Sequence, residues 1–374
     1  MITLVSAVAL ADPPEVHPVL MFEGDAAYQP DERIAETGLS VRRFYLGFRS
    51  EVTHNVRAVA VIDLAGEHPR ILDASLAWRP VDVLELTVGQ AKTPMFPTAR
   101  DQSIETTPLP ELSTVVGALW PGRDPGVEAH LSGADLPIEG WARVGNGSGS
   151  PTGNDNPKLA GDFRLDAVFG RQRRDADRAD VFGLRVGAGA HLEDAEDRGG
   201  VTGETITGFQ FWRPPTISGS RTVLEGHAMI DAGPVRATVE GGTAHESRSE
   251  DTDGNPDTPR KPLPSTDARG ISGEVAWMVT GQHRTPLAWP IEKDDEGPAV
   301  EVTGRVDRLW LGLGAKDVDP GGALGAELGA RAWWPFGVGV GVVGQVLQFD
   351  TAPLETPDDT SALTVLARTT FRVL

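Results

Sequence analysis

Arginine is the residue that this sequence places most regularly for binding charged groups. The chain has 29 arginines against 5 lysines, and ten of the arginines fall on the polar side of segments in which apolar and polar residues alternate. Guanidinium groups bind anions and carboxylates through paired hydrogen bonds. These ten predict a guanidinium track that lines a pore for anions: Arg43, Arg49, Arg57, Arg79, Arg143, Arg164, Arg185, Arg236, Arg305 and Arg331.

Carboxylates fall on the same polar sides and allow a second interpretation of each arginine. Nine of them share those sides, namely Asp73, Glu85, Glu139, Asp162, Asp166, Glu240, Glu274, Glu301 and Glu327. Opposite charges that line a lumen also hold one another in place. Any single arginine could therefore bind anions in the pore or only pair with a neighbouring carboxylate.

The connection at 92–123 is the longest one without clear alternation, and it contains five prolines. A short helical turn within 101–118 is compatible with its sequence. A long ordered loop can fold into a pore and narrow it, and charged rings in a narrow passage set ion selectivity. The candidates for such a constriction are Arg100, Asp101, Glu105, Glu111 and Arg123. The alternative is a surface loop with solvated charges.

Motifs for catalysis and for cofactors are not found. The eight histidines show no H-E-x-x-H spacing, and the chain has no P-loop, no dinucleotide fingerprint and no cysteine. A serine–histidine site assembled across strands, for example from His227 and Ser272, would have no sequence spacing to reveal it. Residues 251–257 resemble a calcium loop but lack its final glutamate. We predict a protein that is not an enzyme, with no cofactor and no metal site.

The arginines and carboxylates lie in segments that we expect to be strands. In 41–50, Phe44, Leu46 and Phe48 share one side, and Arg43 and Arg49 share the other. Similar period-two segments recur along the chain between turns rich in its 44 glycines and 29 prolines. No segment of ten or more residues shows a convincing helical period. The sequence predicts an all-β protein.

Two architectures use many alternating strands: a soluble sandwich or propeller, and a transmembrane barrel. The polar sides carry both signs of charge, no second apolar side is evident to fill a core, and 363–374 alternates up to the last residue. These features favour a transmembrane antiparallel β-barrel in contact with outer-membrane lipid. The alternative is an exported soluble β-protein that binds a glycan or a partner. The formal charge of −20 argues against nucleic-acid binding.

About seventeen segments alternate when 17–28 is included, whereas closed single-chain bacterial barrels have even strand numbers. Either 17–28 lies outside the wall or one strand is missed, so we predict sixteen strands, with eighteen as the alternative. Residues 1–11 are typical of the end of a signal peptide, with an A-x-A site, although they could also form a buried strand. Residues 12–38 form an N-terminal segment or a first strand, and 39–374 form the barrel.

Several segments resemble the phosphate-selective porin O and P family of Gram-negative outer membranes. They include RRFYLGFRS at 42–50, LDASLAWRPVDVLELTVGQAKTPM at 72–95 and PGRDPGVEAHLSG at 121–133, and the order of the matches spans 39–374. The sequence departs from the family's pattern at Gln282 and Leu374. The resemblance implies an outer-membrane homotrimer that lets small hydrophilic solutes or ions diffuse passively, with a preference for anions or phosphate. A structural barrel with a closed lumen is the alternative.

Overall fold

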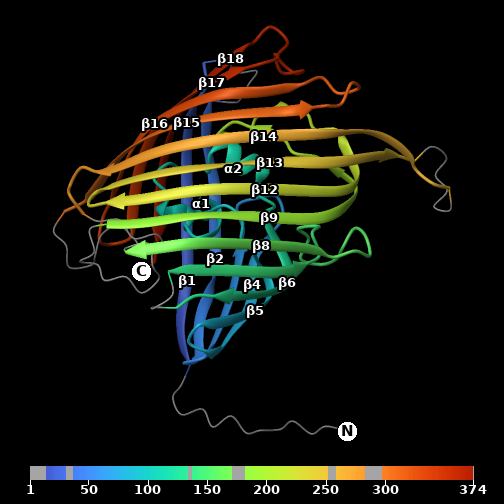
Figure 1. Ribbon diagram of the computed structural model, residues 1–374. Coiled ribbons are helices and arrows are strands. Elements are labelled where there is room, and N and C mark those ends of the chain that lie inside the picture. The colour runs from blue at the N-terminus through green and yellow to red at the C-terminus, as the bar shows by residue number, and fades with distance from the viewer. Residues whose placement is uncertain are drawn as a thin grey trace, which may run out of the picture.

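Sixteen antiparallel strands close into one barrel in the computed structural model (Figure 1). The structure describes residues 14–30, 37–133, 137–170, 182–251, 258–282 and 297–373. The wall consists of β1 (Glu15–Tyr28), β2 (Gly38–Thr53), β3 (Val56–Asp63), β4 (Arg70–Val81), β5 (Leu84–Lys92), β6 (Arg123–Leu131), β7 (Ile138–Gly145), β8 (Ala160–Gly170), β9 (Phe182–Gly199), β12 (Thr216–Ala232), β13 (Val235–Glu250), β14 (Lys261–Met278), β15 (Ala299–Leu313), β16 (Gly321–Trp333), β17 (Val338–Phe349) and β18 (Ser361–Arg372). Each wall strand pairs with its neighbours along the chain, and β1 pairs with β18 to close the ring.

The predicted all-β barrel and its count of sixteen strands are confirmed. Residues 17–28 lie in β1, so the idea that this segment stands outside the wall is wrong. One edge of β1 pairs with β2 and the other with β18. Without β1, the strands β2 and β18 would each have an open edge. The proposed signal segment 1–11 lies outside the described residues.

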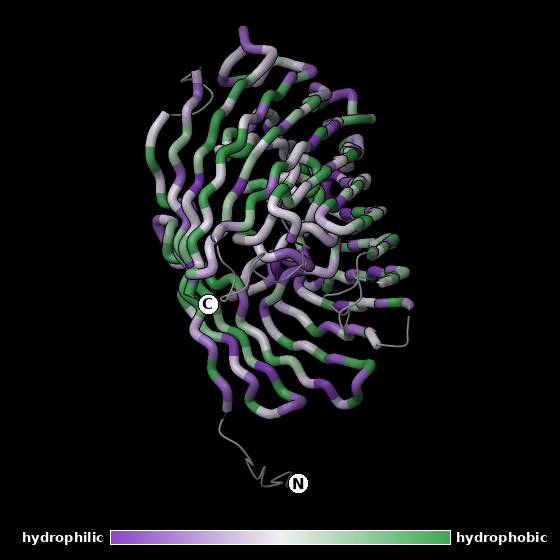
Figure 2. The backbone as a smooth tube through the Cα atoms, turned by 90° about the vertical axis from the view of Figure 1, so that its left-hand side faces the viewer, coloured by the Kyte–Doolittle hydropathy of each residue, from purple (hydrophilic) through white to green (hydrophobic). Residues whose placement is uncertain are grey.

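The outer face of the wall is apolar. Phe22 of β1 is paired with Phe44 on one side and with Phe371 on the other, and all three project outward. Leu165, Val306 and many other large apolar side chains are also exposed on this face. Figure 2 shows hydrophobic and hydrophilic residues alternating along the strands. Such a continuous apolar exterior suits lipid rather than water and speaks against the soluble alternative.

Within the described residues, two connections fold into the lumen. The first runs from β5 to β6 and holds α1 (Pro97–Arg100), the short 3₁₀ turn η1 (Ile104–Thr106) and α2 (Thr114–Leu119). The second, between β9 and β12, contains the small sheet of β10 (Gly203–Glu204) and β11 (Gln210–Trp212). We call them the inward loop (93–122) and the inward hairpin (200–215). Neither these helices nor any other described helix has the length and apolarity needed to cross a membrane.

An apolar core lies inside the barrel, which the sequence did not predict. Val115 of α2 and Phe211 of the inward hairpin pack in one buried cluster with wall residues such as Val223, Leu309 and Leu347. These wall residues lie on the luminal face, so the expectation that no second apolar side exists is wrong. The interior is polar over part of its height and apolar where the two inward segments meet the wall.

Luminal glycines make room for the inward loop. A Cβ atom at Gly270 of β14 would lie 2.8 Å and 2.9 Å from the two γ-methyl carbons of Val115. A Cβ atom at Gly329 of β16 would lie 2.7 Å from a δ-carbon of Leu109. The loop therefore packs against bare backbone at these points, where any larger residue would push it into the lumen.

Candidate functional site

The inward loop is tied to the far side of the barrel through its backbone. The amide of Thr98 in α1 donates to Glu240 Oε1 of β13 at 2.9 Å, and the amide of Thr114 in α2 donates to Asp307 Oδ2 of β15 at 2.9 Å. Ser113 caps α2 by accepting a hydrogen bond from the amide of Val116 at 3.0 Å. Wall carboxylates thus satisfy helix-terminal amides that would otherwise be buried without partners.

Glu111 ties the same loop to the near side. Its carboxylate accepts hydrogen bonds from Arg42 Nε at 2.9 Å, from Arg43 Nη2 at 2.7 Å and from Arg368 Nη2 at 2.7 Å. Burial alone would raise the pKa of this carboxyl. The surrounding guanidinium groups outweigh burial and hold the pKa of Glu111 well below its ordinary value. Glu111 is therefore a permanently charged anchor near neutral pH.

The inward hairpin is fixed in a similar way. The amide of Val201 donates to Glu246 Oε1 at 3.0 Å, and the amide of Ile206 donates to Gln345 Oε1 at 3.1 Å. The helix α2 packs against β10 on one side and against the walls of β13, β14 and β15 on the other. The two inward segments together cover the luminal face of the long strands.

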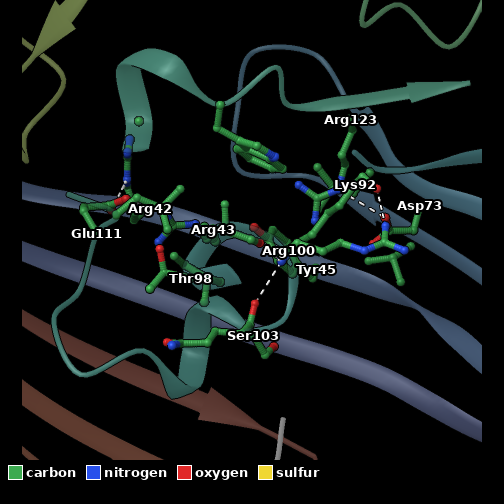
Figure 3. A pocket seen from close by; sticks show the side chains of 18 of the residues that line it. Arg42, Arg43, Tyr45, Asp73, Lys92, Thr98, Arg100, Ser103, Glu111 and Arg123 are labelled. Carbon is green, nitrogen blue, oxygen red and sulfur yellow. Dashed lines mark hydrogen bonds and ion pairs between the residues drawn. The ribbon is translucent and has the colours of Figure 1, made fainter. Parts of the chain in front are cut away.

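A cavity of about 550 Å³ remains beside these segments, against the luminal face of β1 to β5 (Figure 3). We call it the luminal cavity. Six cationic side chains and three acidic ones line it: Arg42, Arg43, Arg49, Lys92, Arg100 and Arg123, against Asp73, Glu111 and Glu204. On β2 alone the lining extends from Arg42 to Arg49, a distance of roughly 23 Å along the strand.

The cations differ in how far they are neutralised. Arg43 donates to Glu23 at 2.5 Å as well as to Glu111, and Arg123 Nε lies 3.1 Å from Asp73 Oδ1. Arg49 is exposed to the cavity and makes no ion pair with any residue in the described part of the chain. Its full charge is therefore available to a passing ion.

The ten arginines predicted to line a pore fall into three groups in the structure: some line the luminal cavity, some point into the lumen elsewhere, and the rest are buried. Arg43 and Arg49 line the luminal cavity. Arg57 and Arg79 point into the lumen on neighbouring strands, where both pair with Glu85. The other six do not line the cavity and are buried instead, five of them beside carboxylates and Arg331 against Thr107 O and Thr370 Oγ1: Arg143, Arg164, Arg185, Arg236, Arg305 and Arg331.

Ion pairs, hydrogen bonds and burial keep these six side chains away from the luminal cavity. Arg164 and Arg185 share Asp166, Arg236 Nε lies 2.7 Å from Asp231 Oδ1, and Arg305 Nη2 lies 2.8 Å from Glu327 Oε2. The inward loop contacts Arg164 and Arg305 directly: Asp101 accepts a hydrogen bond from Arg164, and the carbonyl oxygens of Glu111 and Leu112 accept from Arg305. These contacts are of the kind expected under the alternative interpretation, in which opposite charges hold one another in place.

The predicted constriction residues also divide. Arg100, Glu111 and Arg123 line the luminal cavity, whereas Asp101 faces the wall and pairs with Arg164 Nη2 at 2.7 Å. The side chain of Glu105 lies outside the described part of the structure.

Arg42, Lys92 and Glu204 line the cavity although the sequence did not single them out. The pairing of β1 with β2 shifts by one residue at Glu23 and Gly24, so Arg42 is the extra residue of a β-bulge. The bulge turns Arg42 toward the lumen against the simple alternation. The segment at 42–50, which resembles a family strand, contains both Arg42 and Arg43. Only the strand register shows that both side chains face inward.

The candidate histidine His227 is enclosed by carboxylates. The two ring nitrogens of His227 lie 3.0 Å from Glu225 Oε2 and 3.1 Å from Asp166 Oδ1, so carboxylates, and not Ser272, surround the ring. Within the described ranges no three histidine, aspartate or glutamate side chains are placed to hold a metal ion. Most of the calcium-like loop, 252–257, lies outside those ranges.

Comparison with solved structures places the fold among outer-membrane porins. OmpT of Vibrio cholerae in its trimer form has a TM-score of 0.61 at 12% identity, covering 96% of this chain and 100% of its own. The anion-selective porin of Comamonas acidovorans has a TM-score of 0.59 at 10% identity, with coverage of 96% and 100%. The channel DcaP of Acinetobacter baumannii has a TM-score of 0.58 at 12% identity, with coverage of 96% and 97%. No model of a known protein family matches the sequence, and no curated protein matches it.

The fold and the apolar exterior define the class of protein. A closed sixteen-strand barrel with a lipid-facing surface and a loop folded into its lumen is an outer-membrane β-barrel with the fold of the porins. The predicted location, the outer membrane of a Gram-negative bacterium, agrees with this fold.

Proposed function

We propose that this protein is a non-enzymatic diffusion pore that prefers anions, and that the luminal cavity is its narrowest part. The observation that carries the proposal is the excess of cations on the cavity lining, six against three, in a chain whose formal charge is −20. Charged residues drawn at random from this chain would include more acids than bases, because the chain has 54 acidic and 34 basic residues. The lining is therefore opposite in sign to the protein as a whole.

Electrostatic range supports this assignment of selectivity to the lining. Exposed charges are screened over about 8 Å at physiological ionic strength, so acidic residues on distant loops act weakly on an ion in the cavity. Glu23 and Glu128, which partly neutralise Arg43 and Arg100, are buried behind the lining. An ion in the cavity meets the guanidinium groups first, and Arg49 most strongly.

Phosphate is one anion that this lining could pass. The sequence resembles phosphate-selective porins, and arginine binds phosphate oxygens through paired hydrogen bonds. The anion-selective porin from Comamonas acidovorans, which shares the fold, adds support for anions in general. Phosphate and chloride would compete for the same guanidinium groups.

The lengths of the connections indicate how the barrel is oriented in the outer membrane. The tightest turns join strands at one end of the barrel, as in Val81–Leu84 and Ala232–Val235, although β8 to β9 and β14 to β15 are joined at this end by longer connections. Bacterial barrels place short turns in the periplasm and long loops outside, so we assign the inward loop to the extracellular side. We further propose a homotrimer, the form in which OmpT of Vibrio cholerae was solved; light scattering in detergent measures this directly.

Ion substitution in a planar bilayer tests the proposed function. We expect discrete conductance steps that shrink strongly when chloride is replaced by a bulky, slow anion. Replacing potassium by a bulky cation should reduce the steps less. Equal reductions, or a larger effect of the cation, would contradict the anion preference.

A closed structural barrel is the second candidate, and the apolar core inside the lumen favours it. Clustered residues such as Val115 and Phe211 leave little room for water on the side of β12 to β18. This candidate predicts a heat-modifiable, folded barrel that produces no conductance steps, whereas the luminal cavity beside β1 to β5 favours the pore.

A further inference from the structure

The luminal cavity has an apolar side, where β1 and β3 contribute only apolar residues and β4 adds a leucine beside the polar Asp73 and Ser75. Val19 and Met21 on β1, Val59 and Val61 on β3, and Leu72 on β4 all line the cavity. A water-filled barrel lumen is normally polar, with apolar residues on the lipid side. We call these five residues the apolar wall; it is a second lining feature that charge selectivity does not require.

The strand register places the apolar wall directly beside the unpaired arginine. Arg49 on β2 is paired with Val59 on β3, and Gly47 is paired with Val19 on one side and with Val61 on the other. Gly47 adds no side chain, and a Cβ atom there would collide with the carbonyl oxygen of Ala60. The luminal face of β2 at Gly47 is therefore bare backbone, with Val19 and Val61 on either side. Arg49 follows two residues further along β2.

Part of the apolar wall remains open to a solute. Met21, Val61 and Leu72 are nearly buried, at 2%, 4% and 8% exposure, and give the wall its backing. Val19 and Val59 are only half-buried. Ile104 of the inward loop also lines the cavity and adds apolar surface from the loop side. A solute in the cavity thus meets apolar groups and guanidinium groups at the same depth.

We infer that the cavity selects organic carboxylates with an apolar body over hydrophilic anions. The carboxylate meets Arg49, and the hydrocarbon part lies against Val19, Val59 and the bare backbone at Gly47. An inorganic anion or a sugar acid satisfies the arginine but gains nothing from the valines, because its hydration shell would have to be removed there at a cost. This inference rests on the proposed anion pore and names its class of substrate.

Hexanoate and gluconate test the inference because both are six-carbon monocarboxylates, one apolar and one polyhydroxylated. In planar bilayers at neutral pH we expect hexanoate to reduce the chloride current at a concentration about fourfold lower than gluconate does. That factor corresponds to the transfer of about one methylene group from water. Equal concentrations for the two anions would overturn the inference.

A pair of isosteric variants separates binding from structure. The double variant Val19→Thr with Val59→Thr keeps the size of both side chains and should abolish the difference between hexanoate and gluconate. The control Val83→Thr makes the same exchange in the exposed β4–β5 turn, outside the lining, and should keep the difference. A hexanoate preference that survives in the double variant would also overturn the inference.

Two measurements on the wild-type channel separate selection of apolar carboxylates from anion preference itself. If the channel prefers chloride over potassium but treats hexanoate and gluconate alike, the anion pore stands and the apolar wall has no part in selection. If the wild-type channel shows no anion preference in potassium chloride, the proposed function itself fails.

Discussion

Arg43 Nη2 donates to Glu111 Oε2 at 2.7 Å, and this contact joins the wall of the barrel to the inward loop at the edge of the luminal cavity. The same guanidinium group donates to Glu23 on β1 at 2.5 Å. Arg43 is thus held from two sides while it still lines the cavity. One ion pair therefore fixes the position of the loop and part of the charge that a passing ion meets.

Arg49→Glu should reverse or strongly reduce the anion preference. The substitution replaces the unpaired cation of the lining by an acid, which changes the formal charge of the cavity by two units. Reversal potentials of single channels measure the effect. Arg213→Glu is the matched control, because Arg213 is also exposed, is not part of the lining, and has no ion pair within the described ranges. Similar shifts in both variants would mean that overall charge, and not the lining, sets selectivity.

Glu111→Gln should increase the anion preference and loosen the inward loop. The variant removes one of the three acids of the lining and weakens charged hydrogen bonds from three arginines, with an expected loss of about 2 kcal/mol in the free energy of unfolding. Open-channel current noise should rise as the loop moves. A quiet channel with unchanged selectivity would show that Glu111 does not anchor the loop.

The stabilising effect of Glu111 should depend on pH in one direction. Because the pKa of Glu111 is lowered in the folded protein, its contribution is complete above the ordinary glutamate value of 4.5 and is lost as the pH falls through the lowered value. The difference in unfolding free energy between the wild type and Glu111→Gln should stay constant from neutral pH down to about pH 5. It should shrink only at lower pH. A difference that already shrinks between pH 7 and pH 5 would require a raised pKa instead.

Gly270→Ala should destabilise the barrel through the inward loop. The added methyl group would stand within 3 Å of both γ-methyl carbons of Val115, and such overpacking typically costs about 1–3 kcal/mol. Gly273→Ala on the same strand is the control, since nothing lies within 4 Å of a Cβ atom there. The temperature at which the barrel unfolds on gels should fall for the first variant only. Equal stability of the two would show that the loop does not depend on this close packing.

The barrel was predictable from sequence because lipid imposes a simple rule on its strands. Alternation such as that of Phe44, Leu46 and Phe48 needs no knowledge of other segments, since the lipid face is apolar all round. The position of the loop at 92–123 followed from its length and its lack of alternation. These features depend on local sequence alone.

The interior was harder to predict because it depends on contacts between distant segments. Arg49 and Arg164 both lie on the polar side of an alternating segment. In the structure Arg49 is exposed, whereas Arg164 is covered by the inward loop. Bulges reorient Arg42 and Leu72 toward the lumen without any obvious sign in the sequence. Glycines at luminal positions, such as Gly270 and Gly329, are the one signal that could have located the loop against the wall.

The anion preference of the luminal cavity is best measured as the reversal potential of the purified wild-type protein in a planar bilayer with a gradient of potassium chloride across it. We expect discrete channels whose reversal potential has the sign of chloride permeation, because the cations of the luminal cavity outnumber its acids. A reversal potential of the opposite sign would show that the carboxylates govern the passage and that the pore does not prefer anions.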